Sequence, residues 1–274
     1  MDVTGAIRVA RMTDVGQLRD HNEDAVASDL AIGLVLLADG MGGYKAGEVA
    51  SEIAVLIVTS SISESMQNKQ TLLRPGKTRL PESEVLIEAV AKANAAIYQV
   101  SQEQQQCAGM GTTLVAGIFS DNKLIVGHIG DSRMYRLRGK TLTRLTEDHS
   151  LIQEQINSGE LTEAQAKLSS NKNLVTRALG VDPKVELELH EHDVEVKDIY
   201  LLCSDGLTDL VADEQISMIL LETGGNVEHA AVNLIRFANE MGGKDNISVV
   251  VAYVKKDFSS KFSWVKNILN ANKS

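Results

Sequence analysis

Several residue types are scarce in this sequence of 274 residues, which has two cysteines, three prolines and one tryptophan. Cys107 and Cys203 are too few for a disulfide framework or a cysteine-ligated zinc site. We therefore expect both to be reduced thiols of a cytosolic protein, with Cys203 in the core. The hydrophobic content of 43% and the charged content of 23% exclude a disordered or collagen-like chain and indicate a folded domain.

Long apolar runs are also absent. The longest, at residues 31–38 and 247–254, have eight residues each, whereas a helix needs roughly 18 to cross a bilayer. Residues 1–16 alternate polar and apolar side chains and lack the apolar centre of a signal peptide. We therefore expect no transmembrane segment and a cytoplasmic location.

Positive charge is sparse except at the C-terminus. The formal net charge is -10, and it divides into -14 for residues 1–254 and +4 for residues 255–274. An acidic body of this kind is a poor binder of nucleic acid. The tail places Phe258, Phe262, Val265 and Leu269 at helical spacing among lysines. This pattern predicts a basic amphipathic segment outside a main domain of residues 1–254. It could pack on the acidic domain or make weak contact with an anionic membrane surface.

The order of apolar patterns predicts an α+β fold. Short β-branched and aliphatic runs that end in Gly, Asp or Asn indicate strands at 34–38, 112–119, 124–129, 199–203 and 247–254. Helical periodicity places Val49, Ile53, Leu56 and Ile57 on one face, and further helices are expected within 86–100 and 231–238. Residues 67–84 hold two prolines and are expected to form an exposed loop. Helices layered on an antiparallel sheet or sandwich fit this order best.

Acidic turns follow or precede four of the strands. They contain Asp39, Asp131, Asp205 and Asp245, and any one of them alone would be an ordinary turn. If the strands share a sheet, the four carboxylates converge at one edge and repel one another unless a cation neutralises them. Oxygen ligands without a histidine or cysteine pair favour Mg²⁺ or Mn²⁺ over Zn²⁺.

An arginine and two further carboxylates precede the first of these turns. Arg19 suits a phosphate group because its planar guanidinium can donate two hydrogen bonds at once, and Glu23 and Asp24 follow it closely. His21, His128 and His149 lie near the acidic motifs and could support them or exchange protons, whereas His190, His192 and His229 are expected in solvent. Together these features indicate phosphate chemistry.

Other phosphate-handling motifs are incomplete. Gly42 and Gly47 have the outer spacing of a P-loop, but Glu48 stands where its lysine belongs. Neither cysteine is followed by arginine at the sixth position, as a cysteine-dependent phosphatase requires, and the chain has no Asp-x-Asp motif for an aspartyl-phosphate. The mechanism that remains is attack of a metal-activated water on phosphorus.

In their order along residues 5–254, seven motifs resemble the metal-dependent protein phosphatases of type 2C in their bacterial form. They are Arg19-x-x-Asn22-Glu23-Asp24, Asp39-Gly40-Met41-Gly42-Gly43, Gly111-Thr112-Thr113, Gly130-Asp131-Ser132-Arg133, Thr176-Arg177-Ala178-Leu179-Gly180, Ser204-Asp205-Gly206 and Asp245-Asn246-Ile247-Ser248. The resemblance implies a four-layer αββα sandwich, with two antiparallel sheets flanked by helices. It also implies hydrolysis of phosphoserine and phosphothreonine in proteins, opposing a serine/threonine kinase, by a monomeric enzyme.

The resemblance also implies a role for each site residue. Asp39 would bridge two Mn²⁺ or Mg²⁺ ions, with the Gly40 carbonyl on one ion and both Asp205 and Asp245 on the other. Asp131 would bind a third ion. Glu23 and Asp24 would hold water at the metals, and Arg19 would bind the phosphate.

Two departures and one alternative accompany this assignment. Met41 stands where many eukaryotic relatives have a histidine proposed as general acid, so another group must protonate the leaving group. The expected substrate flap at residues 150–173 ends in Leu168-Ser169-Ser170-Asn171-Lys172-Asn173, where many relatives have a His-Pro pair and an arginine. The alternative is a non-catalytic phosphoprotein-binding module of the same fold, which a missing ligand would favour, and no ligand is missing.

Overall fold

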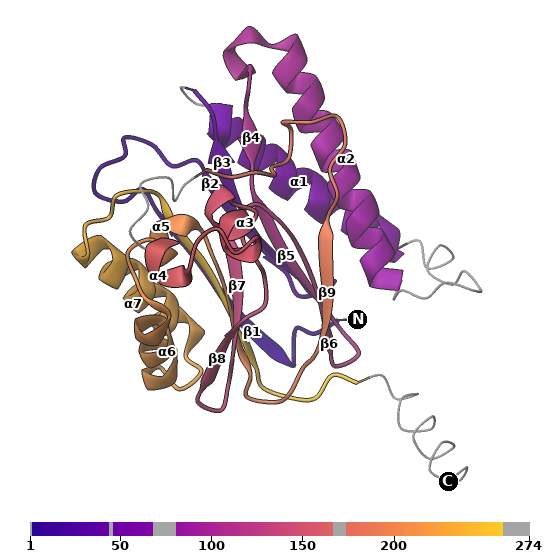
Figure 1. Cartoon of the computed structure of the whole chain (residues 1–274). Coiled ribbons are helices and arrows are strands. Elements are labelled where there is room, and N and C mark those ends of the chain that lie inside the picture. The colour runs from indigo at the N-terminus through magenta and orange to yellow at the C-terminus, as the bar shows by residue number, and fades with distance from the viewer. Residues whose placement is uncertain (1, 44–45, 68–80, 167–173, 260–274) are drawn as a thin grey trace.

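The computed structural model describes residues 2–43, 46–67, 81–166 and 174–259. Two antiparallel sheets pack face to face (Figure 1). One has the order β1-β11-β10-β7-β8, with bounds Ile7–Asp14, Ile247–Val254, Ile199–Cys203, Arg133–Arg138 and Thr141–Arg144. The other has the order β2-β3-β5-β6-β9, with bounds Asp24–Asp29, Leu34–Met41, Leu114–Ser120, Lys123–Ile129 and Glu188–Asp193, and the short β4 (Gly111–Thr112) pairs with β3.

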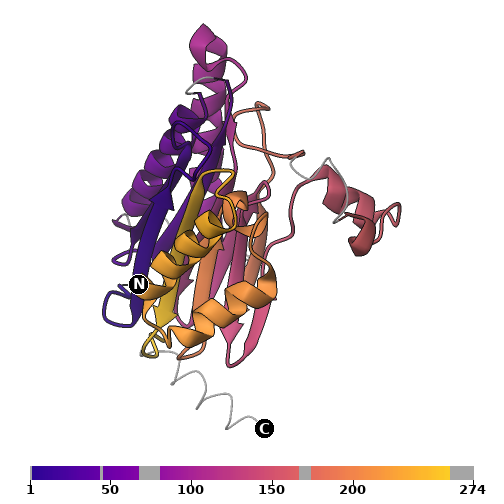
Figure 2. The same ribbon diagram turned by 90° about the vertical axis from the view of Figure 1, so that its left-hand side faces the viewer.

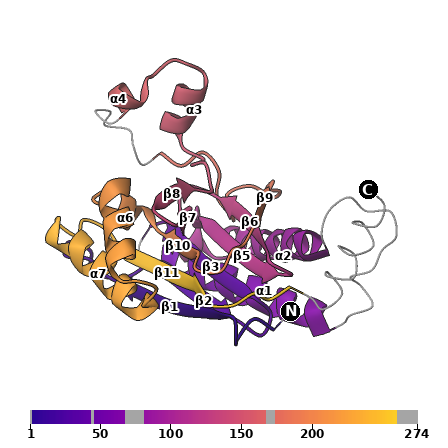
Figure 3. The ribbon, with the colours of Figure 1, turned by 90° about the horizontal axis from the view of Figure 1, so that it is seen from below.

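Helices cover the outer face of each sheet, which completes four layers (Figure 3). Helices α1 (Ala46–Gln67) and α2 (Pro81–Glu103) pack on the β2–β9 sheet, and α6 (Asp213–Glu222) and α7 (Val227–Glu240) pack on the other. A short helix, α5 (Asp205–Thr208), follows β10, and a 3-10 turn, Gln105–Cys107, follows α2. Helices α3 (Leu151–Asn157) and α4 (Glu163–Ala166) project away from the sandwich (Figure 2). The α+β sandwich expected from the sequence is confirmed.

The central strands explain the unbroken apolar runs in the sequence. On β11, Val249 and Val251 join the core beneath α7, while Val250 and Ala252 join the core between the sheets. Alternate side chains of a strand point to opposite faces, so a strand covered on both faces needs apolar residues at every position. This is why the runs at 199–203 and 247–254 coincide with β10 and β11.

Helix α1 differs in part from the sequence interpretation. Its fully buried stripe contains Ala50, Ala54 and Val58, whereas Leu56 is 69% exposed and was wrongly expected on the apolar face. Apolar residues surround much of this helix, so periodicity alone could not select the side that packs on the sheet. By length and composition, Ala46–Met66 could also span a membrane, but in the structure it packs on β2, β3 and α2.

Two other segments extend the fold beyond the predicted elements. The loop expected at residues 67–84 overlaps helix α2, which begins at Pro81, a residue well suited to the first helical position.

At the C-terminus, Phe258 packs edge-on against Phe119 with 6.3 Å between ring centroids. Its backbone N–H donates to Asn122 Oδ1 at 2.8 Å. The apolar stripe expected beyond it, at Phe262, Val265 and Leu269, lies outside the described residues.

Candidate metal and phosphate site

The acidic turns of the sequence come together where strands of both sheets end. Asp39, near the end of β3, lies directly opposite Asp24 at the start of β2. Asp131 follows β6, Asp205 begins α5 after β10, and Asp245 lies two residues before β11. The convergence predicted from four separate strand ends is therefore present, and Asp24 joins it.

Mutual repulsion shows how closely these carboxyl groups are gathered. The pKa of Asp39 lies well above its usual value, first because of burial and then because of negative charge on Asp24, Asp205, Asp131 and Asp245. Burial and the same kind of repulsion also raise the pKa of Asp205 well above its usual value. Burial raises the pKa values of Asp24 and Asp131 to about 6. Such a cluster calls for positive charge between its members.

Two buried carboxylate oxygens also lack a hydrogen-bond partner among the described residues. These are Glu23 Oε1 and Asp24 Oδ1, and His21 Nε2 lies 3.5 Å from the former. The other oxygen of Asp24 accepts a hydrogen bond from Ser204 Oγ at 2.9 Å. Buried acceptors without donors are uncommon in proteins, and an all-oxygen donor set suits a hard divalent cation or its water ligands. The residues present therefore fit Mn²⁺ or Mg²⁺.

Arg19 lies at the rim of this cluster. Its Nη2 donates to Asp245 Oδ2 at 2.6 Å, and half of its side chain, 51%, is exposed. The guanidinium thus keeps donors available to an incoming anion while one contact fixes its position.

Close backbone contacts hold the site together around Gly40. The Gly40 N–H donates to the Glu23 carbonyl at 3.1 Å, and a side chain on Gly40 would place Cβ 2.1 Å from the Gly47 carbonyl oxygen. The start of α1 therefore touches the end of β3 directly. In the sequence Gly47 indicates only an incomplete P-loop, whereas in the structure it permits this close approach.

Asn246 is a second residue whose importance the sequence did not indicate. Its Oδ1 accepts from the Glu23 N–H at 2.8 Å, and its Nδ2 donates to the carbonyls of Val15 and His21, each at 3.0 Å. One buried amide thus fastens the segment that carries Arg19 and Glu23 to the Asp245 turn. Its place in the Asp245-Asn246-Ile247-Ser248 motif was the only signal in the sequence.

A row of histidines lies beside the Asp131 turn. Ligand atoms of His128, His149 and Glu188 lie within 4.8 Å of one another, a grouping that sequence spacing did not reveal. Both nitrogens of His149 are already engaged, since Nδ1 accepts from the Gly130 N–H and Nε2 lies 3.1 Å from Glu188 Oε2. His190, expected in solvent, is exposed yet contacts Glu188 Oε1 at 2.8 Å. We interpret the row as a structural bridge between the Asp131 turn and β9.

The expected flap begins at the base of this region. Its described part, residues 150–166, forms the projecting α3 and α4 (Figure 2). Ser150 caps α3 by accepting from the Gln153 N–H. The departure at Leu168–Asn173 lies outside the described residues.

Comparison with known proteins identifies the family. The model of the Protein phosphatase 2C family matches residues 17–234. Serine/threonine phosphatase stp of Listeria monocytogenes is 37% identical over 252 residues, which cover 91% of this chain and 96% of that protein. Serine/threonine protein phosphatase PstP of Mycobacterium tuberculosis is 38% identical over 92% of this chain and 46% of its own length.

Solved structures agree with this assignment. The crystal structure of Mycobacterium tuberculosis PstP/Ppp has a TM-score of 0.81 and 37% identity, covering 92% of this chain and 100% of that one. A structure of the PstP catalytic domain with two manganese ions has a TM-score of 0.78 at 37% identity, covering 92% and 99%. The fold is that of these phosphatase structures. This chain belongs to the protein phosphatase 2C family.

Proposed function

We propose that this chain is a metal-dependent phosphatase that hydrolyses phosphoserine and phosphothreonine in proteins. The observation that carries the proposal is the gathering of carboxylates from different strand ends, with two buried oxygens left without hydrogen-bond partners among the described residues. The similarity to phosphatases named stp and PstP supports the substrate class. The non-catalytic alternative is less well supported, because every acidic residue expected at the site is present in the cluster.

The site residues have different proposed roles in this reaction. Asp39, the Gly40 carbonyl, Asp205 and Asp245 would hold two Mn²⁺ or Mg²⁺ ions, and Asp131 would hold a third. Glu23 and Asp24 would accept hydrogen bonds from water bound to these ions. When bound, the cations supply an activated water and offset charge on the phosphoryl oxygens. Arg19 binds and orients the phosphate.

No cysteine nucleophile competes with water in the described part of the chain. Both cysteines are buried, and burial raises the pKa of the Cys203 thiol to about 12. Because the thiolate is the reactive form, Cys203 serves as a core residue, as its sequence context predicted.

The cellular setting is a further proposal. We infer a monomeric cytoplasmic enzyme that reverses the action of a serine/threonine kinase on its targets. The similarity to serine/threonine phosphatases of bacteria supports the opposing kinase. A direct test of the proposed function is release of phosphate from a phosphothreonine peptide with and without added Mn²⁺.

Arg19 and Asp131 are expected to affect different steps. Arg19→Ala should raise KM for a phosphopeptide by about tenfold with a smaller change in kcat, because it removes the exposed anion donor at the rim. Asp131→Ala should instead lower kcat by about tenfold or more, because it removes a carboxylate from the proposed third site. Steady-state kinetics at saturating Mn²⁺ distinguish the two. If both variants melt early and lose both parameters together, Arg19 and Asp131 have structural roles only.

A further inference from the structure

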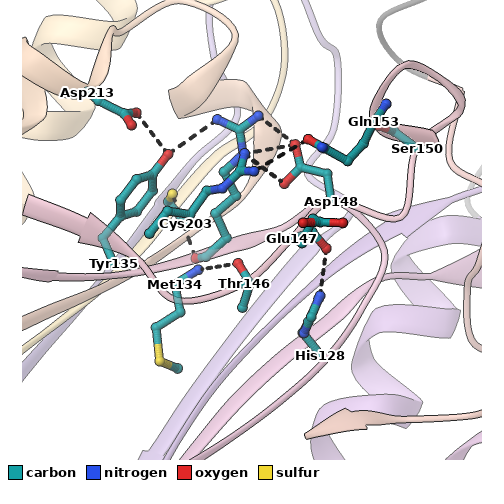
Figure 4. A network of polar contacts seen from close by, with 12 residues as sticks. His128, Met134, Tyr135, Thr146, Glu147, Asp148, Ser150, Gln153, Cys203 and Asp213 are labelled. Atoms are coloured by element: carbon teal, nitrogen blue, oxygen red, sulfur yellow. Dashed lines mark hydrogen bonds and ion pairs between the residues drawn. The ribbon is translucent and has the colours of Figure 1, made fainter. Parts of the chain in front are cut away.

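An ion pair outside the carboxylate cluster joins the Asp131 turn to the neighbouring segment. Arg133, two residues after Asp131, donates from Nε to Asp148 Oδ1 at 2.9 Å and from Nη2 to Oδ2 at 2.6 Å. The two side chains are only 24% and 10% exposed. Arg133 Nη1 also donates to Tyr135 Oη at 3.2 Å. That hydroxyl in turn donates to Asp213 Oδ1 at 3.0 Å (Figure 4).

Hydrogen bonds align the same two segments on either side of this pair. Gly130 and His149 exchange two bonds, since the Gly130 N–H donates to His149 Nδ1 at 3.1 Å and the His149 N–H donates to the Gly130 carbonyl at 3.0 Å. Beyond the pair, the Leu145 N–H donates to the Met134 carbonyl at 2.7 Å, and the Met134 N–H donates to Thr146 Oγ1 at 3.1 Å. Residues 145–149 therefore lie alongside residues 130–134 and are hydrogen-bonded to them at both ends.

The segment of residues 145–149 is also the base of the projecting helices. Asn157 Nδ2 of α3 donates to Glu147 Oε1 at 2.6 Å. The chain that returns from the projection bonds to the same base, because the Thr176 N–H donates to the His149 carbonyl at 2.8 Å. Both ends of the projection are thus attached to the segment that Asp148 holds against the Asp131 turn.

We propose that the Arg133–Asp148 pair is a positioning device that fixes the Asp131 turn relative to the base of the projecting segment, and thereby sets the affinity of the Asp131 side of the site for its cation. The inference rests on the proposed role of Asp131. Arg133 acts through Asp148 and the turn, so it is a positioning residue and need not touch the phosphate.

The partners of Asp148 explain why loss of Arg133 should disturb the turn. Arg144 Nη1 also lies 3.7 Å from Asp148 Oδ1, but this longer contact does not replace the hydrogen bonds from Arg133. Removing Arg133 alone leaves a carboxylate that is mostly buried and has lost its bidentate partner beside Asp131, and such a group is costly. The turn is then expected to move so that water reaches Asp148. Removing both charges avoids that cost.

The chain contains a matched control. Arg138 lies on the same strand, β7, and makes an equivalent bidentate pair with Asp198, at 2.9 Å from Nε and 2.7 Å from Nη2. Asp198 is 1% exposed. The Arg138 guanidinium donates to the Asp193 carbonyl and to the side chains of Glu195 and Asp198, none of which belongs to the carboxylate cluster. Loss of Arg138 therefore reports the general cost of breaking a bidentate pair on this strand.

The test compares Arg133→Met, Asp148→Asn, the double variant and Arg138→Met. Loss of a residue that orients metal ligands typically costs 10-fold to 100-fold in affinity. Arg133→Met should therefore raise the Mn²⁺ concentration for half-maximal aryl phosphate turnover by about tenfold, and calorimetry should show a similar loss in the weakest Mn²⁺ binding step. The double variant should be shifted less than Arg133→Met. In the metal-free protein, amide hydrogen exchange at Gly130, His149 and Leu151 should quicken in Arg133→Met and not in Arg138→Met.

Arg138→Met should lower the melting temperature and leave the Mn²⁺ dependence unchanged. The inference is overturned if Arg133→Met and Arg138→Met show the same Mn²⁺ dependence. It is also overturned if the fold-change in half-maximal Mn²⁺ concentration of the double variant equals the product of the fold-changes of Arg133→Met and Asp148→Asn. Should Arg133→Met fail to fold, Asp148→Asn and the double variant carry the same comparison. An inactive parent chain would instead contradict the proposed function, and the exchange measurement on metal-free protein would still decide whether the pair fixes the turn.

Discussion

Replacing Asp39 by asparagine is expected to lower kcat/KM at least about a thousandfold while raising the melting temperature of the metal-free protein. The loss of activity follows from removing the carboxylate at the centre of the cluster. The gain in stability follows from electrostatics, because burial and neighbouring carboxylates hold the pKa of Asp39 well above its usual value. Asparagine keeps a similar shape without the charge.

The raised pKa of Asp39 determines how the stability of the metal-free protein changes with pH. The folded metal-free protein holds the Asp39 proton more tightly than the unfolded chain does. Ionisation therefore costs stability once the pH exceeds the unfolded pKa, and the cost is complete above the folded pKa. The stability advantage of Asp39→Asn should therefore be larger at pH 8 than at pH 5. Thermal denaturation in chelator at both pH values measures it.

Asp198 provides the control for this prediction. Asp39 lies among other carboxylates, whereas the carboxylate of Asp198 is paired with Arg138 and accepts from Tyr200 Oη at 3.1 Å. Asp198→Asn should therefore lower the melting temperature and keep activity. If Asp39→Asn also lowered the metal-free melting temperature, or retained activity, the assigned role of Asp39 would be wrong.

Alanine at Gly40 is expected to destabilise the fold by about 3 kcal/mol or more and to abolish activity. Its Cβ would lie 2.1 Å from the Gly47 carbonyl oxygen and 2.6 Å from the Glu23 carbonyl oxygen. Both obstacles are backbone atoms, so relief requires α1 and the Glu23 segment to move away from β3. That movement would separate the residues proposed to hold the cations.

Gly43 is the matched control, because, apart from Gly43 itself and its two neighbours in the chain, no atom of the described residues lies within 4 Å of the position that its Cβ would take. Gly43→Ala should keep both stability and activity close to those of the parent chain. Chemical denaturation of the two variants gives the free energy of unfolding directly. Equal stability for Gly40→Ala and the parent would contradict the close backbone approach described above.

The sequence predicted the parts of the molecule that depend on local pattern. The strands at 199–203 and 247–254 are buried on both faces, so their apolar runs were unambiguous. Strand β1 was not predicted, because it carries Arg8 and Arg11 and is only partly buried along most of its length. For helix α1, apolar residues on more than one face led to the error at Leu56.

At the candidate site too, the features that depend on local sequence pattern were predicted, and those that depend on contacts between distant segments were not. Carboxylates at strand ends are visible in the sequence, and the repulsion expected among them is enough to predict the need for a cation. Asn246 and Arg133 appeared only as members of motifs, and their roles were not predicted, because their partners lie far away along the chain or across a loop whose path the sequence does not specify. Asn246, for example, contacts Glu23 across 223 positions. Such residues are found only when the fold brings them together.

The most direct test of the central claim is phosphate release from a phosphothreonine peptide by the full chain, first in excess chelator and then after Mn²⁺ is restored in excess. If the carboxylate cluster works by holding cations that activate water, activity should be absent in chelator and should return with Mn²⁺. Asp39→Asn, assayed in the same way, should stay inactive in both conditions. Turnover that persists in chelator, or that Asp39→Asn retains, would contradict the account.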